Sequence, residues 1–250
     1  MRILTIGDIH GNIKWINLIP QFKDFDKVIF MGDYFDSFTE PIKHQIIAFK
    51  KVVELIKSNP NKFIGLWGNH DLHYLKTKLG NLPKQSSGFQ EKHAAVITIL
   101  LEESFLLFKA AHQETTENNT FLFTHAGITP DLVKAILEFK KGKIWEEIFD
   151  VLLENDIDKV FNFLFDINCP LLYYVGPDRE GKDTFSGMFW CDKSELDCNN
   201  IYTSTTFQVV GHTYVNYPHI GENNCIFVDS LKDNKILKIV KITDNLYAIN

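Results

Sequence analysis

Arginine is scarce in this 250-residue sequence, in which Arg2 and Arg179 are the only two. Because guanidinium is the side-chain group that holds a phosphate or carboxylate with two parallel hydrogen bonds, such recognition has at most two places in the chain. Basic residues are also outnumbered, 26 against 32 acidic ones, and the formal net charge is -6. This balance argues against extended nucleic-acid binding, which needs a broad basic face, but it allows a small phosphate site.

Cysteine pairs and long apolar runs are missing as well. Four cysteines without Cys-x-x-Cys spacing do not suggest a zinc knuckle or a redox pair, and we interpret them as reduced core thiols: Cys169, Cys191, Cys198 and Cys225. The apolar run Ile3–Ile6 is interrupted by Asp8, far short of a signal sequence. No predominantly apolar stretch of about 20 residues could span a membrane, so we expect a cytoplasmic protein without a membrane partner.

The composition that remains is that of an ordinary globular protein. Hydrophobic residues make up 45% of the chain and charged residues 23%, and we find no repeat, linker or low-complexity tract. A single domain over residues 1–250 is therefore expected. Its least regular part, about residues 130–200, is a possible cap-like insertion.

Short apolar segments alternate with helical patterns. Five segments have the length and composition of buried strands and are expected to pair in one sheet: Arg2–Ile6, Lys27–Met31, Lys62–Trp67, Thr120–Phe123 and Phe207–Val210. The spacing from Ile42 to Ile56 predicts a helix opened by Pro41 and closed by Asn59-Pro60, which implies a strand–helix–strand crossover.

The C-terminal tail predicts a second, more antiparallel sheet. Its strand-like segments are Cys225–Val228, Ile236–Ile242 and Leu246–Ile249, with a turn at Asp233-Asn234. The predicted fold class is therefore α/β, as a two-sheet α/β sandwich flanked by helices.

Each of the five strands in the first group is followed at once by polar side chains that can bind a metal. The motifs are Gly7-Asp8-Ile9-His10-Gly11, Gly32-Asp33-Tyr34-Phe35-Asp36, Gly68-Asn69-His70-Asp71, Thr124-His125-Ala126-Gly127 and Gly211-His212-Thr213. One polar residue after a strand is usually a turn or cap residue, but five in register are harder to dismiss. Because ligands of α/β proteins bind at the carboxyl ends of strands, these side chains are expected in one pocket.

The mixture of carboxylate and imidazole indicates which ions this pocket would take. It suits two divalent ions, with Mn, Fe or Zn favoured over Ca or Mg, which prefer oxygen ligands alone. A metal pair lowers the pKa of a bridging water and stabilises in-line displacement at phosphorus. Its positive charge would attract a phosphate dianion.

In order and in residue type, the five motifs resemble those of the calcineurin-like metallophosphoesterases. The resemblance is strongest to the branch of serine/threonine protein phosphatases, their bacterial and phage relatives and symmetrical diadenosine tetraphosphatases. It implies the metallophosphoesterase fold and a set of metal ligands, with Asp8 and His10 on the first ion, Asp33 bridging, and Asn69, His125 and His212 on the second. It also implies that His70, held by Asp36, is the general acid, as the chemistry of imidazole near neutral pH allows.

The sequence departs from this pattern at its arginines. Protein phosphatases of the branch place arginines where this chain has Ser37 and Trp67. Arg2 begins a strand roughly 20 Å before Asp8 and cannot replace them. Arg179 lies in Gly176-Pro177-Asp178-Arg179-Glu180-Gly181, which resembles the later phosphate-binding arginine loop of the family. Arg179 is thus either a substrate phosphate ligand or a salt-bridged loop residue.

Two further residues bear on the resemblance. Tyr214 replaces the last histidine of the Gly-His-x-His pattern in the nuclease and purple-phosphatase branches, which disfavours a nuclease. His73 lies near the third motif, where a packed role is favoured over a supporting one.

The sequence therefore predicts a binuclear metal-dependent phosphoesterase with manganese as the favoured metal and iron or zinc as alternatives. A phosphomonoesterase resembling the protein phosphatases is favoured, with a metal-bridging hydroxide attacking phosphorus in line and His70 protonating the leaving oxygen. The expected partner is a phosphorylated small molecule, nucleotide or phosphoprotein. One alternative is a phosphodiesterase or dinucleotide polyphosphatase on the same centre. Another is a catalytically silent protein-binding scaffold, against which the complete set of ligands argues.

Overall fold

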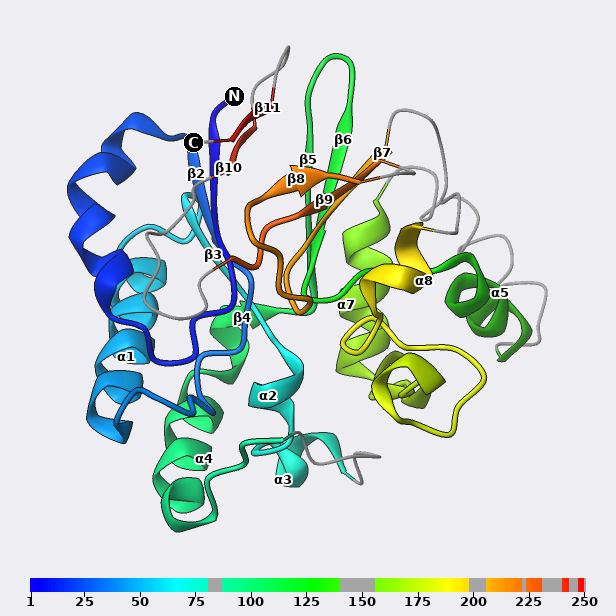
Figure 1. The fold of residues 1–250 in the computed structure, drawn as a ribbon, viewed down its shortest axis with the longest axis horizontal. Helices are drawn as coiled ribbons and strands as arrows, with labels where there is room; N and C mark the ends of the chain where they lie inside the picture. Colours follow the sequence, from blue (N-terminus) through cyan, green and yellow to red (C-terminus); the bar gives the residue numbers. More distant parts are fainter. Residues whose placement is uncertain are drawn as a thin grey trace.

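The computed structural model describes residues 1–80, 87–139, 156–197, 206–221, 224–230, 240–242 and 247–249. These residues form two sheets with helices outside them (Figure 1). The first sheet has the strand order β11 (Tyr247–Ile249), β10 (Val240–Ile242), β1 (Ile3–Ile6), β2 (Lys27–Phe30), β3 (Phe63–Leu66), β4 (Phe108–Lys109). The second has the order β5 (Ala111–Thr115), β6 (Thr120–Thr124), β7 (Thr206–Val210), β9 (Cys225–Phe227), β8 (His219–Ile220). The predicted two-sheet α/β sandwich is confirmed.

The helices lie on both outer sides of the sandwich. In Figure 1, α1 and α7 lie at opposite sides of the strands, and the main contacts of these two helices with strands are with β3 and β5 respectively. The α-helices are α1 (Ile42–Ser58), α2 (Asn69–Leu72), α3 (Lys76–Leu79), α4 (Ala94–Glu103), α5 (Pro130–Phe139), α7 (Ile157–Asp166) and α8 (Lys193–Asp197). The 3₁₀ helices are η1 (Lys14–Asp24), η2 (Glu91–His93), η3 (Phe105–Leu107), η4 (Pro170–Tyr173) and η5 (Pro177–Arg179).

The crossover predicted around α1 is confirmed. Strands β1 to β4 are parallel neighbours, and α1 connects β2 to β3. Pro41 precedes the first turn of α1 with extended backbone, and Asn59 follows the last. Proline suits this position because its fixed φ matches the helix and its missing N–H would have no intrahelical partner.

The assignment of strands to sheets differs from the prediction. Strands β6 and β7 do not join β1, β2 and β3; they pair with each other and with β9 in the second sheet. The tail is also divided, because β10 pairs antiparallel to β1 in the first sheet. An apolar run predicts that a strand is buried, but it does not indicate which strand it pairs with. That choice depends on contacts between segments far apart in the chain. The Asp233-Asn234 turn and Cys198 lie outside the described residues, whereas the other three cysteines are buried thiols.

The five strands are apolar on both faces because one face lies in the core between the sheets and the other lies under the helices. Side chains of β1–β3 and of β6, β7 and β9 meet there: Ile3, Ile29, Met31, Ile64, Leu66, Phe121, Phe123, Val209, Ile226 and Val228. The alternate residues of β1 and β2, such as Leu4 and Val28, pack with Phe49 and Val52 of α1 instead. Because strand side chains alternate between faces, each strand is buried on both sides. None of the described helices is both long and apolar enough to cross a bilayer.

Candidate metal centre

The polar residues predicted to bind metal follow the strands of both sheets and meet where the two sheets end. Asp8 and His10 follow β1, Asp33 follows β2, and His125 and His212 follow β6 and β7. Among the described non-glycine residues, seven have positive φ, and they include His10, Asp33 and His212 at φ of 40°, 52° and 63°. Such left-handed backbone is costly for these residues and is concentrated at functional sites.

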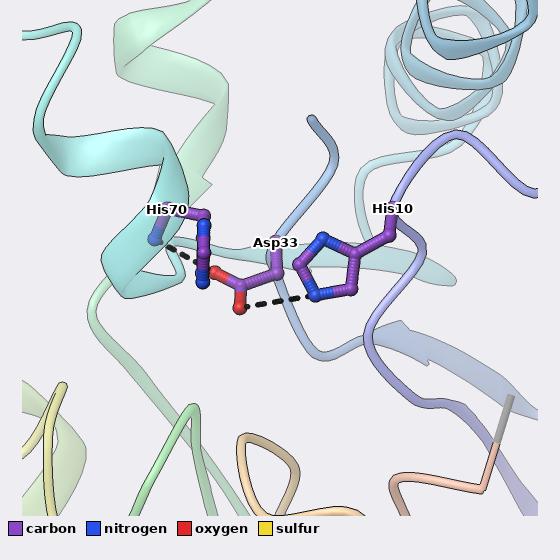
Figure 2. A group of neighbouring side chains, drawn as sticks. All are labelled: His10, Asp33 and His70. Atoms are coloured by element: carbon purple, nitrogen blue, oxygen red, sulfur yellow. Dashed lines mark hydrogen bonds and ion pairs between the residues drawn. The ribbon is translucent and has the colours of Figure 1, made fainter. Parts of the chain in front are cut away.

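Asp33 lies at the middle of this cluster. Its Oδ1 accepts the backbone N–H of His70 at 2.9 Å, and its Oδ2 is 3.6 Å from Nε2 of His10 (Figure 2). The same Oδ2 is 3.4 Å from Nε2 of His125. Two groups of donor atoms, each within 4.8 Å, share Asp33: His10, Asp33 and His70, and Asp33, His125 and His212. The shared carboxylate is what a residue bridging two ions requires.

Backbone carbonyls fix which nitrogen two of the histidines present to the centre. Nδ1 of His125 donates to the carbonyl of Met31 at 2.8 Å, and Nδ1 of His10 donates to that of Phe35 at 2.7 Å. Their Nε2 atoms are therefore the ones that face the other polar groups, an orientation typical of metal-binding histidines.

Asn69 and His212 complete the second group. Oδ1 of Asn69 is 2.9 Å from Nε2 of His125 and 3.0 Å from Nδ1 of His212. The oxygens of Asp8 accept the backbone N–H of His212 at 3.1 and 3.0 Å. Both oxygens of Asp8 thus contact the loop that carries His212, and the two groups of donor atoms that share Asp33 do not include Asp8.

The electrostatics of the cluster fit cations bound among these residues. Burial and the neighbouring Asp229 raise the pKa of Asp8 well above its usual value. Burial disfavours ionised Asp33, but His125 and His70 outweigh it and hold the pKa of Asp33 low. Burial lowers the pKa of His125, but Asp33 and Asp8 raise it to about 10. Nε2 of His212 is buried without a hydrogen-bond partner among the described residues. Carboxylates crowded together and a histidine nitrogen without a hydrogen-bond partner are ligands that a divalent transition-metal ion would bind.

Asp71 was not singled out in the sequence, yet its carboxylate holds the loops of β2 and β3 together. It accepts the backbone N–H groups of Asp33 at 2.9 Å, Tyr34 at 2.9 Å and Gly68 at 3.0 Å. Burial and Asp33 raise the pKa of Asp71 to about 8. Gly68 has no alternative here, because a Cβ would lie 2.1 Å from Oδ1 of Asp33. The sequence feature that could have indicated this role is the position of Asp71, an acid in the first turn of the short helix after Gly68.

The predicted pairing of His70 with Asp36 is present. Nδ1 of His70 is 3.0 Å from Oδ2 of Asp36, which is fully buried. Burial lowers the pKa of His70, but Asp33 and Asp36 outweigh it and raise the pKa above its usual value. The structure also places Nε2 of His73 at 2.7 Å from the same Asp36 oxygen. The sequence favoured a packed role for His73, and the structure adds to it a polar contact with Asp36.

The comparison with known proteins decides the family. A family model described as calcineurin-like phosphoesterase matches residues 1–213. The chain belongs to the calcineurin-like phosphoesterase family. It is therefore a metal-dependent phosphoric ester hydrolase that acts on phosphorylated substrates, as predicted.

Other comparisons are more distant from this phosphoesterase. No curated protein sequence matches the chain. Yfce, a phosphoesterase from E. coli, is 13% identical in sequence, with a TM-score of 0.46 over 100% of this chain and 92% of that one. A serine/threonine phosphatase from Saccharomyces cerevisiae is 21% identical, with a TM-score of 0.32 over 53% of this chain and 40% of that one.

Arg179 of this phosphoesterase has the ion pair that the sequence left as one alternative. Its Nη2 is 2.8 Å from Oδ2 of Asp192 and donates to Oγ1 of Thr213 at 2.5 Å. Thr213 follows His212. Burial, together with the charges of His125 and Arg179, depresses the pKa of His212 well below its usual value. Arg179 thus lies next to the centre, with 26% of its side chain exposed.

Proposed function

We propose that this phosphoesterase binds two divalent ions, with manganese favoured, and hydrolyses phosphomonoesters. Asp8, His10 and Asp33 would hold the first ion, and Asp33 would share the second with Asn69, His125 and His212. Such ions supply an activated water nucleophile and a positive field for a phosphate dianion. The observation that carries the proposal is Asp33, which belongs to both groups of donor atoms.

The residues around the ions would bind the phosphate and supply the proton. Because Nδ1 of His70 faces Asp36, Nε2 is the ring nitrogen left to protonate the leaving oxygen. Asp36 holds the ring in that orientation and stabilises its positive charge before the proton is given up. Arg179, beside Thr213, would bind an oxygen of the substrate phosphate as a charge-assisted donor.

A hydrolysis panel tests this function. The purified protein would be assayed with Mn²⁺ on an aryl phosphomonoester, an aryl phosphodiester, diadenosine tetraphosphate and a phosphopeptide. Fastest turnover of a monoester, abolished by chelation, is expected. Faster turnover of the diester or of diadenosine tetraphosphate would assign the centre to the larger substrate instead. No turnover of any of the four with Mn, Fe or Zn would refute the proposal.

A further inference from the structure

Three side chains contact the Asp36 carboxylate, rather than the single one that the His70–Asp36 pair requires. Its Oδ2 faces Nδ1 of His70 at 3.0 Å and Nε2 of His73 at 2.7 Å. Its Oδ1 accepts the hydroxyl of Tyr74 at 2.5 Å. The hydroxyl of Tyr74 in turn accepts the backbone N–H of Gln90 at 2.9 Å. Asp36, His73 and Tyr74 are all buried, so these contacts are shielded from water.

This arrangement restricts how Asp36 can turn. Two imidazole nitrogens, those of His70 and His73, lie within 3.0 Å of the same oxygen, Oδ2. Rotation of the carboxylate to improve one contact would weaken another, and Tyr74 restrains the opposite oxygen. His73 is itself held in place, because its ring lies edge-on to Tyr74 and Phe89, with centroids 4.4 and 4.9 Å away. The contact of His73 with Asp36 is thus part of a rigid assembly.

We infer that His73 is a positioning residue for proton transfer, acting on His70 through the carboxylate that both contact. This inference rests on the proposed function of His70. As an oxygen from water bonds to phosphorus, the P–O bond to the leaving group breaks. The leaving oxygen keeps the bonding electron pair and takes the proton from Nε2 of His70. His73 transfers no proton in this step and stays in contact with Asp36 throughout. Without His73, only Tyr74 and His70 restrain Asp36, which then holds the His70 ring toward the substrate less firmly.

Two substitutions of His73 separate the lost contact from lost packing. In His73→Gln the amide nitrogen lies where Nε2 was, whereas in His73→Asn it falls one bond short. Each variant would be assayed on an alkyl phosphate, whose leaving oxygen needs a proton, and on a nitrophenyl phosphate, whose leaving oxygen needs little. We expect His73→Asn to lose about tenfold on the alkyl ester but less than about twofold on the aryl ester. His73→Gln should recover most of the loss.

A double-mutant cycle distinguishes a positioning role of His73 from a purely structural one. In a His70→Asn background, His73→Asn should cause no further loss, because its effect passes through His70. His112→Gln is the control, since His112 is a buried histidine bonded to Glu114 outside the centre. Equal losses on both esters, multiplicative losses in the cycle, or no recovery in His73→Gln would overturn the inference.

Failure of the proposed function would look different. In that case the wild-type protein would hydrolyse neither ester, and imidazole ¹⁵N spectra would still test the contact. The His70 ring signals should shift in His73→Asn and return in His73→Gln. Unchanged His70 signals in both variants would overturn the role of His73 in positioning that ring.

Discussion

Nδ1 of His125, after β6 of the second sheet, donates to the carbonyl of Met31, after β2 of the first sheet, at 2.8 Å. This hydrogen bond joins the two sheets at the point where their polar residues meet. It also leaves Nε2 of His125 facing Asp33 and Asn69. This one contact thus both links the two sheets and orients a proposed metal ligand.

Metal should stabilise the fold as well as support activity. A divalent ion relieves the repulsion among buried carboxylates in the folded protein and should bind the folded state alone. By mass action, each ion at a hundredfold excess over its Kd should then add about 2.7 kcal/mol to the free energy of unfolding. Metal analysis should find up to two ions per chain, and Mn²⁺ should raise the Tm. Asp33→Asn should weaken binding at both sites, whereas exposed Asp24→Asn should not. Two tightly bound ions in Asp33→Asn would refute the bridging role.

Acid catalysis should be separable from metal binding at His70. His70→Asn should keep its metal yet lose roughly 10² to 10⁴ in rate on an alkyl phosphate. The loss on a nitrophenyl phosphate should be smaller, because that leaving group needs little protonation, and Asp36→Asn should show the same pattern to a lesser degree. Metal analysis and kinetics on both esters check this. Loss of an ion in His70→Asn would make His70 a metal ligand instead.

Gly68 should be required because Asp33 of the metal centre lies too close for a side chain, and not because of its backbone conformation. Gly68→Ala would place a Cβ 2.1 Å from Oδ1 of Asp33, whereas Gly80→Ala would strain a backbone of φ +70° with nothing closer than 3.5 Å. Each substitution should cost about 1–3 kcal/mol in unfolding experiments. Only Gly68→Ala should also weaken Mn²⁺ binding in a titration. Equal metal affinity in the two variants would contradict this account of the turn.

The parts of this site that the sequence could predict are those with a local signal. Asp8, Asp33 and His125 each follow an apolar run directly, so their places at strand ends could be predicted and their convergence expected. Asp71 had only the weaker signal of an acid in the first turn of a short helix. His73 had none, because the carboxylate that it contacts lies 37 positions earlier in the chain. The same limit explains the misassigned sheets, since strand partners are chosen across distant segments.

Glu114 should make the stability of the sandwich depend on acid pH. Burial raises its pKa, but hydrogen bonds from His112 and Lys27 outweigh this and hold the pKa below 4.5. Since the folded pKa lies below the unfolded one, the contribution is complete above about 4.5 and is lost as pH falls through the folded pKa. Glu114→Gln should therefore cost about 1 kcal/mol in urea unfolding at pH 7, and this loss should shrink as the pH is lowered below about 4.5. A loss independent of pH would argue for packing instead.

Arg179 is the remaining candidate for holding substrate phosphate, and its ion pair with Asp192 offers a test. A charge-assisted bidentate contact with phosphate predicts that Arg179→Ala loses about 2 kcal/mol in kcat/KM, roughly thirtyfold. Arg179→Lys should recover only part, because it keeps the charge but not the planar fork. Metal content should not change. Steady-state kinetics on a phosphomonoester measure the effect.

Asp192→Asn is the matched variant, because it removes the ion pair at 2.8 Å but leaves the guanidinium in place. If Arg179 binds phosphate, Asp192→Asn should keep most of the wild-type kcat/KM, because the donors remain available to the substrate. If Arg179 only braces the loop beside Thr213, the two substitutions should cause similar losses. Wild-type kcat/KM in Arg179→Ala would exclude both roles and leave the phosphate to the metals, backbone amides and lysines, since Arg2, the other arginine, lies just before β1.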